Sequence, residues 1–182
     1  KLIRNNKAYY CFCSKDRLVK LRSQHNSYDR HCRNIDSNDS LARVQAGEKH
    51  TIRFKSPTTG TTTATDLIRN KIIVQNEQLD DFILFKTDGF PVYHLAAMVD
   101  DHLMNITHVI RGEEWLSTLP KHVLLIRALE WQEPTWCHLS VLKQPGGKGK
   151  MSKRQNITTQ HSNERSIFIG DIRNTGFHPE AV

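Results

Sequence analysis

Residues 106–143 carry the pattern that most constrains the fold of this chain. ITHVIRG is typical of a short strand ending at Gly112, and LPKHVLLIRALEW, with Pro120 in its first turn, is typical of a helix. HLSVLK then predicts a second strand. Strand, helix and strand in this order predict a βαβ unit with parallel strands and a right-handed crossover. Ligands of such sheets bind beyond the carboxyl ends of the strands, which selects RGEEW and the loop at residues 144–154.

Residues 1–90 show a different pattern. Tyr9–Cys13 predicts a strand, and Lys15–Gln24 predicts a short basic helix with Ser14 as its cap. The segment around SYDRHCRN is expected to be irregular, residues 57–65 to form a turn, and IRFK, LIRNKIIV and FILFKTDG to form antiparallel strands and hairpins. The sequence therefore predicts an α/β fold in which an α+β module precedes the βαβ unit.

Composition narrows the partners of the chain. The formal net charge of +7 and the pI near 9.4 favour a polyanionic partner, and nucleic acid is the first candidate. A charge excess that only keeps the protein soluble is the alternative. No apolar run approaches the length of about 18 residues that spans a bilayer, so a membrane protein is not expected.

The two ends of the sequence indicate a larger protein. KLIRNNKAYY lacks the apolar core and cleavage site of a signal peptide. GFHPEAV starts a helical pattern that stops after three residues, so we expect the chain to be the middle of a larger protein. The cysteines are Cys11, Cys13, Cys32 and Cys137. Because the C-x-C pair is too tight for an easy mutual disulfide, the cysteines indicate a reducing compartment or a metal site.

The loop GGKGKMSKRQ concentrates mobile positive charge. Gly146, Gly147 and Gly149 allow the backbone to close over a ligand, and Lys150 and Lys153 are three residues apart, so both can approach one anion. A triphosphate is the obvious anion, since ammonium groups that reach a departing pyrophosphate lower the barrier to its release. A solvated basic loop is the alternative.

Two longer motifs resemble a known family. KMSKR at residues 150–154 resembles the second motif of the class I aminoacyl-tRNA synthetases, and the segment from DGFPVYHLAAMVDDH to VIRGEEWLSTLPKHVLLIRALEW resembles the bacterial and mitochondrial glutamyl-tRNA synthetases. YYCFCSKDRL and YDRHCRN resemble the inserted acceptor-binding domain of that family, and GFHPEAV resembles the segment entering its stem-contact region. The resemblance implies the second half of a Rossmann-like catalytic domain over 91–145, with an acceptor-binding insertion over 1–90 and the KMSKR loop and start of the stem-contact region over 146–182.

The resemblance also implies roles for individual residues. Tyr93 and Arg111 would bind glutamate, and a core tyrosine and an ion-paired surface arginine are their alternatives. The remaining assignments are ATP binding for Glu114, Trp115, Leu142, Lys150 and Lys153, and catalysis for Lys150 and Lys153. For Leu142, plain core packing is an equal alternative.

Further assignments concern RNA and metal. Candidates for tRNA binding are Arg22, Arg30, Arg33 and Arg53, each with a solvated basic face as an equal alternative. The family resemblance implies a Zn²⁺ site at Cys11, Cys13 and Cys32, as found in some members, but the histidine that can follow the last cysteine is Asn34 here. Tyr28 or His31 would then supply the fourth ligand.

Several other residues receive a structural interpretation. Asp100 and Asp101 are read as a pair that buttresses the site rather than as magnesium ligands, and His94, His102 and His108 as scaffold, because their spacing matches no compact ligand set. Ala97 stands where many relatives have asparagine near the substrate amino group, so specificity or affinity for glutamate is expected to differ.

The reaction implied is ATP-dependent ligation of L-glutamate to tRNA(Glu) through a glutamyl-adenylate, with ATP and Mg²⁺, in a monomer. The alternatives are a glutamyl-queuosine tRNA(Asp) synthetase and a non-catalytic RNA-binding module derived from a synthetase. The HIGH-like first motif of the family is not in these residues, so we expect the chain alone to be inactive. The mitochondrial matrix is the expected compartment, with the bacterial cytoplasm as the alternative.

Overall fold

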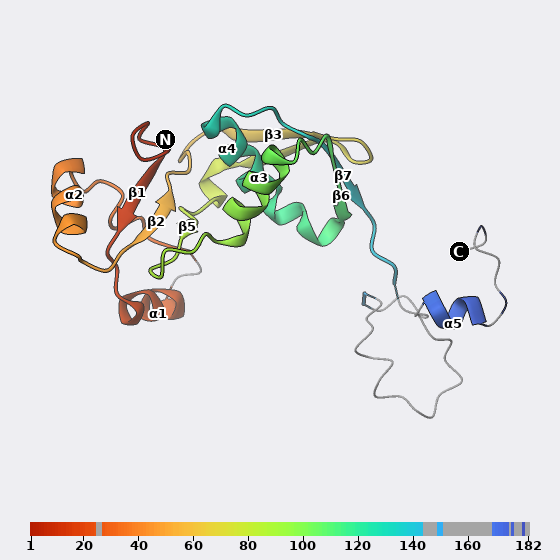
Figure 1. The fold of residues 1–182 in the computed structure, drawn as a ribbon, viewed down its shortest axis with the longest axis horizontal. Coiled ribbons are helices and arrows are strands. Elements are labelled where there is room, and N and C mark those ends of the chain that lie inside the picture. Colours follow the sequence, from red (N-terminus) through yellow and green to blue (C-terminus); the bar gives the residue numbers. More distant parts are fainter. Residues whose placement is uncertain (25–26, 144–148, 151–168, 175, 177–179, 181–182) are drawn as a thin grey trace, which may run out of the picture. The chain divides into compact units, whose positions relative to one another are not determined.

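The computed structural model describes residues 1–24, 27–143, 149–150, 169–174, 176 and 180. The chain divides into two compact units, Lys1–Leu139 and Ser140–Val182. The first unit holds two sheets with the helices α1 to α4 around them (Figure 1). In the second unit, α5 (Ile169–Asn174) is the single helix among the described residues.

The first sheet has three antiparallel strands, in the order β1 (Ala8–Cys11), β2 (Thr51–Phe54) and β5 (Ile83–Phe85). The helices α1 (Lys15–Gln24) and α2 (Ser37–Gln45) lie beside it (Figure 1). The sequence predicted the bounds of α1, and Ser14 caps it, because its Oγ accepts a hydrogen bond from the backbone N–H of Arg17 at 3.2 Å.

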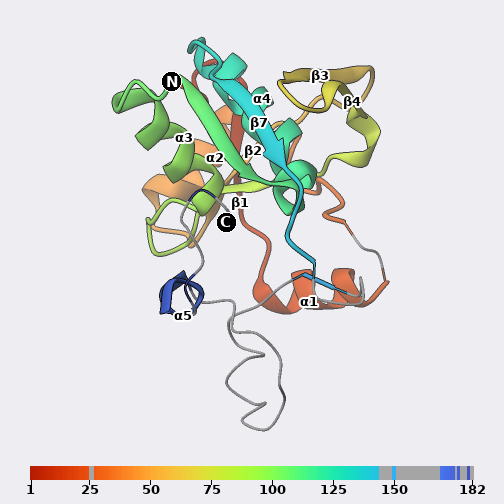
Figure 2. The ribbon, with the colours of Figure 1, turned by 90° about the vertical axis from the view of Figure 1, so that its right-hand side faces the viewer.

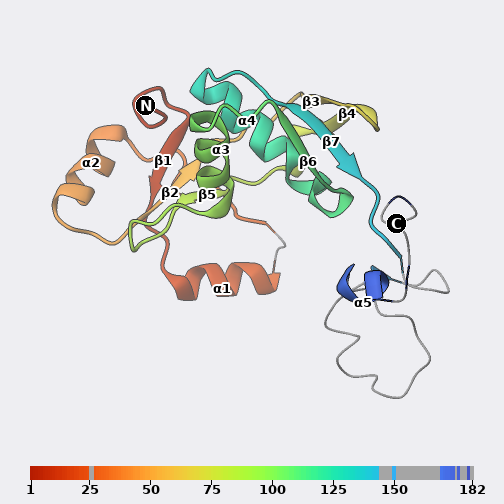
Figure 3. The ribbon, with the colours of Figure 1, turned by 45° about the vertical axis from the view of Figure 1, so that its right-hand side comes forward.

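The second sheet has four strands, in the order β4 (Asn70–Gln75), β3 (Thr61–Asp66), β7 (Thr135–Leu139) and β6 (His108–Gly112). β7 lies between β6 on one side and the β3–β4 hairpin on the other (Figure 2). β6 and β7 are parallel, and α4 (Leu119–Leu129) connects them (Figure 3). The predicted parallel βαβ unit is therefore confirmed.

Two details of the predicted strands are wrong. The second strand of the unit covers Thr135–Leu139 rather than residues 138–143, because its partner β6 ends at Gly112, opposite Leu139. Residues 57–65 were predicted as a turn, but β3 begins at Thr61. Its residues alternate between exposed and buried positions, with Thr62, Ala64 and Asp66 buried, which is the pattern of a strand with one covered face.

The predicted boundary near residue 90 does not separate the two sheets. β3 and β4 precede that boundary, yet β3 pairs in parallel with β7 through Asp66 and Trp136. The sheet that carries the βαβ unit thus includes a hairpin from the predicted α+β module. The assignment of residues 1–90 to acceptor binding stays a prediction.

Helix α3 (Tyr93–Leu103) was not predicted from the sequence. Its N-cap residue, Val92, makes no side-chain capping hydrogen bond, so the usual start signal is missing. α3 buries Leu95 and Met98 in the core of the first unit, where they join Val123, Ile126 and Trp136. Two short 3₁₀ segments, η1 (Asn76–Gln78) and η2 (Glu113–Thr118), complete the unit. Among the residues described, no helix has the length and apolar character needed to cross a membrane.

Candidate functional site

The register of β6 and β7 places Arg111 and His138 side by side at the carboxyl ends of two parallel strands. The two residues are paired in the ladder, one position before each strand ends at Gly112 and Leu139. Paired residues of neighbouring strands point to the same face of a sheet. The edge that the sequence selected as a binding position is therefore where these two side chains meet.

The guanidinium of Arg111 is held by two histidines. Its Nε donates a hydrogen bond to Nε2 of His138 at 2.9 Å, and its Nη1 donates to Nδ1 of His122, on α4, at 3.1 Å. The third nitrogen, Nη2, is buried and has no hydrogen-bond partner among the described residues. Burial lowers the pKa of Arg111, although the charges of Tyr93, Asp101 and Asp66 oppose this. A buried donor without a partner is rare in proteins and suits a ligand that brings a carboxylate.

Two aromatic residues, Tyr93 and Trp115, contact each other, and Tyr93 neighbours His122, one of the two histidines that hold this arginine. Tyr93 is the first residue of α3 and is 55% exposed, so it is not a core tyrosine. Its ring lies 5.3 Å from the ring of Trp115, on η2, measured between centroids. Tyr93 also neighbours the ring of His122 at 6.5 Å. The structure thus brings together the two predicted glutamate-binding residues and one of the predicted ATP-binding residues.

Glu114 follows the end of β6 on η2. Its carboxylate packs so closely against the backbone of Gly112 that an added Cβ at that position would overlap it. Gly112 therefore leaves the space that the Glu114 side chain occupies. The neighbouring Glu113 forms an ion pair with Arg69, next to the β3–β4 turn. A carboxylate at this edge of the sheet is consistent with the predicted role of Glu114 in ATP binding, which stays a prediction.

The remaining predicted ATP-binding residues belong to the second unit. Leu142 is 76% exposed and lies outside β7, so it is not packed in a core. Lys143 and Lys150 form an isolated antiparallel bridge, and Gly149 has a φ of +82°, a conformation that glycine adopts without strain. Lys153, Gly146 and Gly147 lie outside the described residues.

Three of the four arginines proposed for tRNA surround one buried carboxylate. Asp81 is fully buried and accepts hydrogen bonds from Arg33 Nη1 at 2.7 and 2.8 Å, while Arg30 Nε lies 3.6 Å away. Arg53 is 5% exposed, donates to the backbone carbonyl of Asp81 at 2.8 Å and stacks over the ring of Tyr28. Arg53 therefore has little exposed surface to offer tRNA, and Arg30 and Arg33 have internal partners, while the tRNA assignment of the three arginines stays a prediction.

Arg22 is the exception among the four. It lies in the last turn of α1 and lines a cavity of about 280 Å³ together with Lys121 of α4 and His94 of α3. Lys121 is 3.9 Å from Asp80, a distance at which a partly exposed pair attracts weakly. Arg53 lines the same cavity, so Arg22, Arg53 and Lys121 place three cations at one cavity of the first unit.

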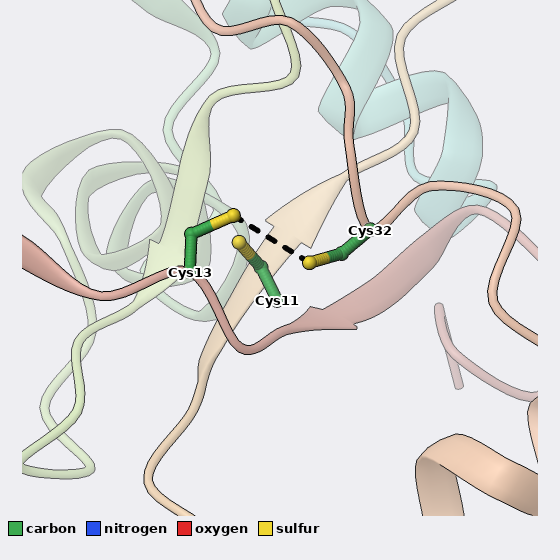
Figure 4. Close-up of side chains that lie close together, drawn as sticks. All are labelled: Cys11, Cys13 and Cys32. Atoms are coloured by element: carbon green, nitrogen blue, oxygen red, sulfur yellow. Dashed lines mark hydrogen bonds between the residues drawn. The ribbon is translucent and has the colours of Figure 1, made fainter. Parts of the chain in front are cut away.

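Cys11, Cys13 and Cys32 form a compact cluster (Figure 4). Their sulfur atoms all lie within 4.8 Å of one another, with Cys13 and Cys32 3.6 Å apart. The hydroxyl of Tyr28 lies 3.3 Å from the sulfur of Cys11 and 3.6 Å from that of Cys13. His31 is exposed and is not part of the cluster. Of the two predicted fourth ligands, the structure therefore places Tyr28 at the thiols.

The thiols of this cluster are electrostatically unequal. Hydrogen bonds from Cys32, then from Tyr28 and the backbone of Cys13, lower the pKa of Cys11 to about 4, although burial opposes them. The same hydrogen bond to Cys11, together with burial, raises the pKa of Cys32. One thiolate is thus stabilised inside the cluster before any metal binds, and a thiolate is the form that ligates Zn²⁺.

Asp101, His102 and His108 lie away from the carboxyl ends of the strands. They line a cavity of about 350 Å³ whose walls include the first residues of β6 and β7, His108 and Thr135. The ring of His102 stacks on Trp131 with 4.0 Å between centroids. Within the described residues, the three cysteines are the one group of three or more potential metal ligands lying together, so Asp100 and Asp101 belong to no such group.

His122, His138 and Asp66 were not identified from the sequence as part of the site. Asp66 accepts a hydrogen bond from Nδ1 of His138 at 2.7 Å, and His122 Nε2 lies 3.0 Å from Nδ1 of His94. The strand predicted at 138–143 put His138 at a strand start, out of register with Arg111. Had the strand been placed three residues earlier, the pairing would have indicated His138.

Comparison with known proteins identifies a family. The family described as tRNA synthetases class I (E and Q), catalytic domain, matches residues 1–181. Glutamate-tRNA ligases of Finegoldia magna and Alkaliphilus metalliredigens are 41% and 42% identical over 188 residues, which is 100% of this chain and 36% of each relative. The chain thus spans about a third of the length of the curated relatives it matches.

Solved structures agree with these relatives. A crystal structure of a glutamate tRNA ligase from Elizabethkingia meningosepticum, in complex with its amino acid, matches with a TM-score of 0.79 and 35% identity, over 88% of this chain and 34% of that one. Glutamate-tRNA synthetase from Elizabethkingia anophelis matches with a TM-score of 0.76 and 34% identity, over 97% and 35% of the two chains.

Proposed function

The chain belongs to the catalytic-domain family of the class I tRNA synthetases (E and Q), and from this premise we propose that the natural polypeptide containing it joins L-glutamate to tRNA(Glu) with ATP. The observation that carries the proposal is the buried Nη2 of Arg111, which has no hydrogen-bond partner among the described residues and lies at the carboxyl ends of two parallel strands. A guanidinium in this position matches the carboxylates of glutamate. The Elizabethkingia meningosepticum relative was solved with its amino acid bound, which supports the same use of the site here.

The reaction has two steps. The α-carboxylate of glutamate attacks the α-phosphate of ATP, which forms glutamyl-adenylate and releases pyrophosphate. The terminal ribose hydroxyl of tRNA(Glu) then attacks the activated carbonyl and displaces AMP. No protein nucleophile is needed, so these residues act by positioning and by charge. Arg111 and Tyr93 hold glutamate, Glu114 and Trp115 contact ATP, and Lys150 and Lys153 balance the charge of the departing pyrophosphate.

Mg²⁺ supplies further positive charge to the phosphates when it is bound together with ATP. The described residues offer no compact carboxylate cluster, and we assign none of them to Mg²⁺. Ala97, on α3, takes the place of an asparagine that we expect near the substrate amino group, so that group has one fewer polar partner. We therefore expect weaker binding of the amino group than in relatives that have the asparagine.

Replacing Lys150 by Ala tests the phosphate role. We expect the glutamate-dependent exchange of pyrophosphate into ATP by the natural polypeptide to slow by about 100-fold, while the Kd for glutamate changes by less than about 3-fold, because the lysine acts on charge that develops in the transition state. Lys71→Ala, an exposed lysine on β4, is the matched control and should leave both values unchanged. Equal losses in exchange rate and in glutamate binding would contradict the role of Lys150.

The two alternative functions are less favoured. The relatives that match the full chain are named glutamate-tRNA ligases, whereas a glutamyl-queuosine tRNA(Asp) synthetase is expected to have a degraded KMSKR segment. A non-catalytic RNA-binding module would have no use for a buried, unpartnered arginine nitrogen at the ligand-binding edge of the sheet. For tRNA itself, Arg22 and Lys121, which line one cavity, are the basic residues that support acceptor binding.

A structural Zn²⁺ at the cysteine cluster is part of the proposal, and the donors fit it. Four ligands around a tetrahedral Zn²⁺, with Zn–S bonds of about 2.3 Å, place their sulfur atoms about 3.8 Å apart. Cys13 and Cys32 are separated by 3.6 Å, and the Tyr28 oxygen is 3.3 Å from Cys11. Cys11, Cys13, Cys32 and Tyr28 would hold the metal, which would tie β1 to the segment at residues 28–35 and would have no part in the reaction.

The zinc content of the purified chain tests this site. We expect about one Zn²⁺ per chain by elemental analysis, lost in Cys13→Ser because a hydroxyl is a poor replacement for a thiolate ligand. Cys137→Ser changes a buried cysteine of β7 outside the cluster and should keep the metal. Tyr28→Phe tests the fourth ligand: loss of Zn²⁺ in this variant indicates a phenolate ligand, and retention of Zn²⁺ indicates a bound water in that position. Absence of Zn²⁺ from a folded chain prepared with excess zinc would contradict the site.

The compartment and the oligomeric state are predictions as well. The first relatives are bacterial, which supports the bacterial cytoplasm over the mitochondrial matrix. The prediction of a monomer awaits sedimentation of the natural polypeptide, where a mass of one chain is expected.

A further inference from the structure

We propose that His138, Asp66 and His122 are positioning residues that hold Arg111 through two neutral imidazoles, which fix the guanidinium while leaving its charge available to the substrate. This inference rests on the proposed function for the identity of the substrate. The arrangement itself follows from the hydrogen bonds of the five side chains Asp66, His138, Arg111, His122 and His94.

The direction of each hydrogen bond follows from the arginine. A guanidinium has five N–H donors and no acceptor, so both of its histidine partners must accept. Nε2 of His138 and Nδ1 of His122 therefore carry no proton while these contacts exist. A protonated imidazole has two N–H groups and would face the arginine with a donor and a like charge.

On one side, the proton of His138 must then lie on Nδ1. That nitrogen donates to Oδ2 of Asp66 at 2.7 Å, and the backbone N–H of His138 donates to the same oxygen at 3.0 Å. Burial would raise the pKa of Asp66, but hydrogen bonds from His138 and from the N–H groups of Arg69 and Ile68 lower it, so a carboxylate is present. His138 and Asp66 are both buried, which fixes the ring in this tautomer.

On the other side, the proton of His122 must lie on Nε2. That nitrogen donates to Nδ1 of His94 at 3.0 Å, so His94 carries its own proton on Nε2. Burial and the positive charge of Arg111 lower the pKa of His122 to about 3. Burial also lowers the pKa of His94. The hydrogen-bonded chain of side chains from Asp66 to His94 therefore allows only one placement of the imidazole protons.

Neutral histidine partners leave Arg111 more of its positive charge than a carboxylate partner would. An arginine paired with a carboxylate is held in place, but its charge is cancelled before a substrate arrives. Two neutral imidazoles hold Nε and Nη1 of Arg111 without a direct ion pair, and the carboxylate of Asp66 lies one ring further away, so it attracts the arginine only at a distance. Nη2, the nitrogen without a hydrogen-bond partner, thus keeps its positive charge for a ligand carboxylate. This explains why the site uses two buried histidines where a single aspartate would fix the arginine.

The charged and titratable groups around the two histidines determine how the protonation of their rings depends on pH. His122 faces Arg111, His94, Lys121 and His138, and Tyr93 and Trp136 neighbour its ring. His138 faces Asp66 and Arg111, and its carbonyl accepts from Arg69 at 3.3 Å. Since His122 has a pKa near 3 when folded and about 6.5 when unfolded, its neutral form persists in the folded protein at pH 5.

Nitrogen-15 NMR of the imidazoles in the unmodified 182-residue chain tests the proton arrangement. We expect His138 as the Nδ1–H tautomer and His122 as the Nε2–H tautomer, with His122 neutral from pH 8 to pH 5. The opposite tautomer on either ring, or a His122 that titrates near pH 6.5, would overturn the inference. This measurement needs neither glutamate nor ATP, so its outcome is independent of the proposed function.

The positioning role is tested by kinetics of the natural polypeptide. His138→Leu removes the acceptor, and we expect the KM for glutamate to rise at least about 10-fold with the KM for ATP unchanged. His138→Gln keeps an acceptor near the position of Nε2 and should restore the KM to within about 3-fold. A glutamate KM that is unchanged in His138→Leu would overturn the positioning role. An unmodified polypeptide that never activates glutamate would instead refute the proposed function, while the tautomers still decide the histidine arrangement.

Discussion

Replacing Arg111 by Ala is expected to raise the KM for glutamate by about 100-fold or more in the natural polypeptide. The substitution removes a charged group whose buried, unpartnered Nη2 carries two N–H groups that a substrate carboxylate can accept from. Hydrogen bonds to charged groups contribute about 1.5–3 kcal/mol each, and two of them correspond to a factor of 100 or more in affinity. The assay is glutamate-dependent pyrophosphate exchange at saturating ATP.

Arg111→Lys separates shape from charge. Lysine keeps the positive charge but has no fork that can contact two histidines and a ligand at once, so we expect a rise of at least about 10-fold in the glutamate KM. Arg4→Ala, an exposed arginine near the start of the chain, is the control and should behave like the unmodified protein. A glutamate KM within about 3-fold of normal in Arg111→Ala would contradict the assignment of this residue.

The second large effect is expected at Asp81, and on stability rather than activity. Asp81 is fully buried and accepts hydrogen bonds from Arg33, from the hydroxyl of Tyr9 at 2.8 Å and from the backbone N–H of Ser56 at 3.0 Å. Asp81→Ala would leave the partly buried Arg33 without its counterion and the phenol of Tyr9 without its acceptor. Breaking a buried ion pair from one side costs about 3–5 kcal/mol.

Urea unfolding of the 182-residue chain measures this cost. Asp80→Ala is the matched control, because the neighbouring Asp80 is partly exposed and lies 3.9 Å from Lys121, a contact worth at most about 1 kcal/mol. We expect the midpoint of unfolding to fall markedly for Asp81→Ala and only slightly for Asp80→Ala. Equal midpoints for the two variants would contradict the structural role of Asp81. Arg33 would then again be a candidate for binding the phosphates of tRNA.

The sequence predicted the parts of the fold whose causes are local. The helix at Leu119–Leu129 was predicted because apolar residues recur with helical spacing after a proline that suits a first turn. The helix at Lys15–Gln24 was predicted from its serine cap. The start of α3 has no side-chain cap, and so nothing in the local sequence indicated it.

The parts that were not predicted depend on pairing between distant segments. The strand at Thr61–Asp66 contains several threonines that read as a turn, and it becomes a strand because β4 and β7 pair with it on either side. The buried state of Asp81 is equally non-local, since its partners come from β1 and from the segment after Tyr28. Basic residues such as Arg53 therefore looked available to RNA when the fold encloses them.

The candidate site shows the same division. The motif residues Tyr93, Arg111 and Trp115 were selected from the sequence, and the structure brings them together. Of the residues that orient Arg111, Asp66 and His138 were missed because their contacts depend on strand register, and His122 was missed because its motif indicated only a helix. At the cysteine cluster, spacing alone indicated Cys11 and Cys13. The fold places Tyr28, and not His31, next to them.

A crystal structure of the natural polypeptide with L-glutamate bound tests the central claim most directly. We expect a carboxylate oxygen of glutamate within hydrogen-bond distance of Arg111 Nη2, with Nε and Nη1 still on His138 and His122. A glutamate bound away from Arg111, with that arginine paired to a protein carboxylate, would contradict the account.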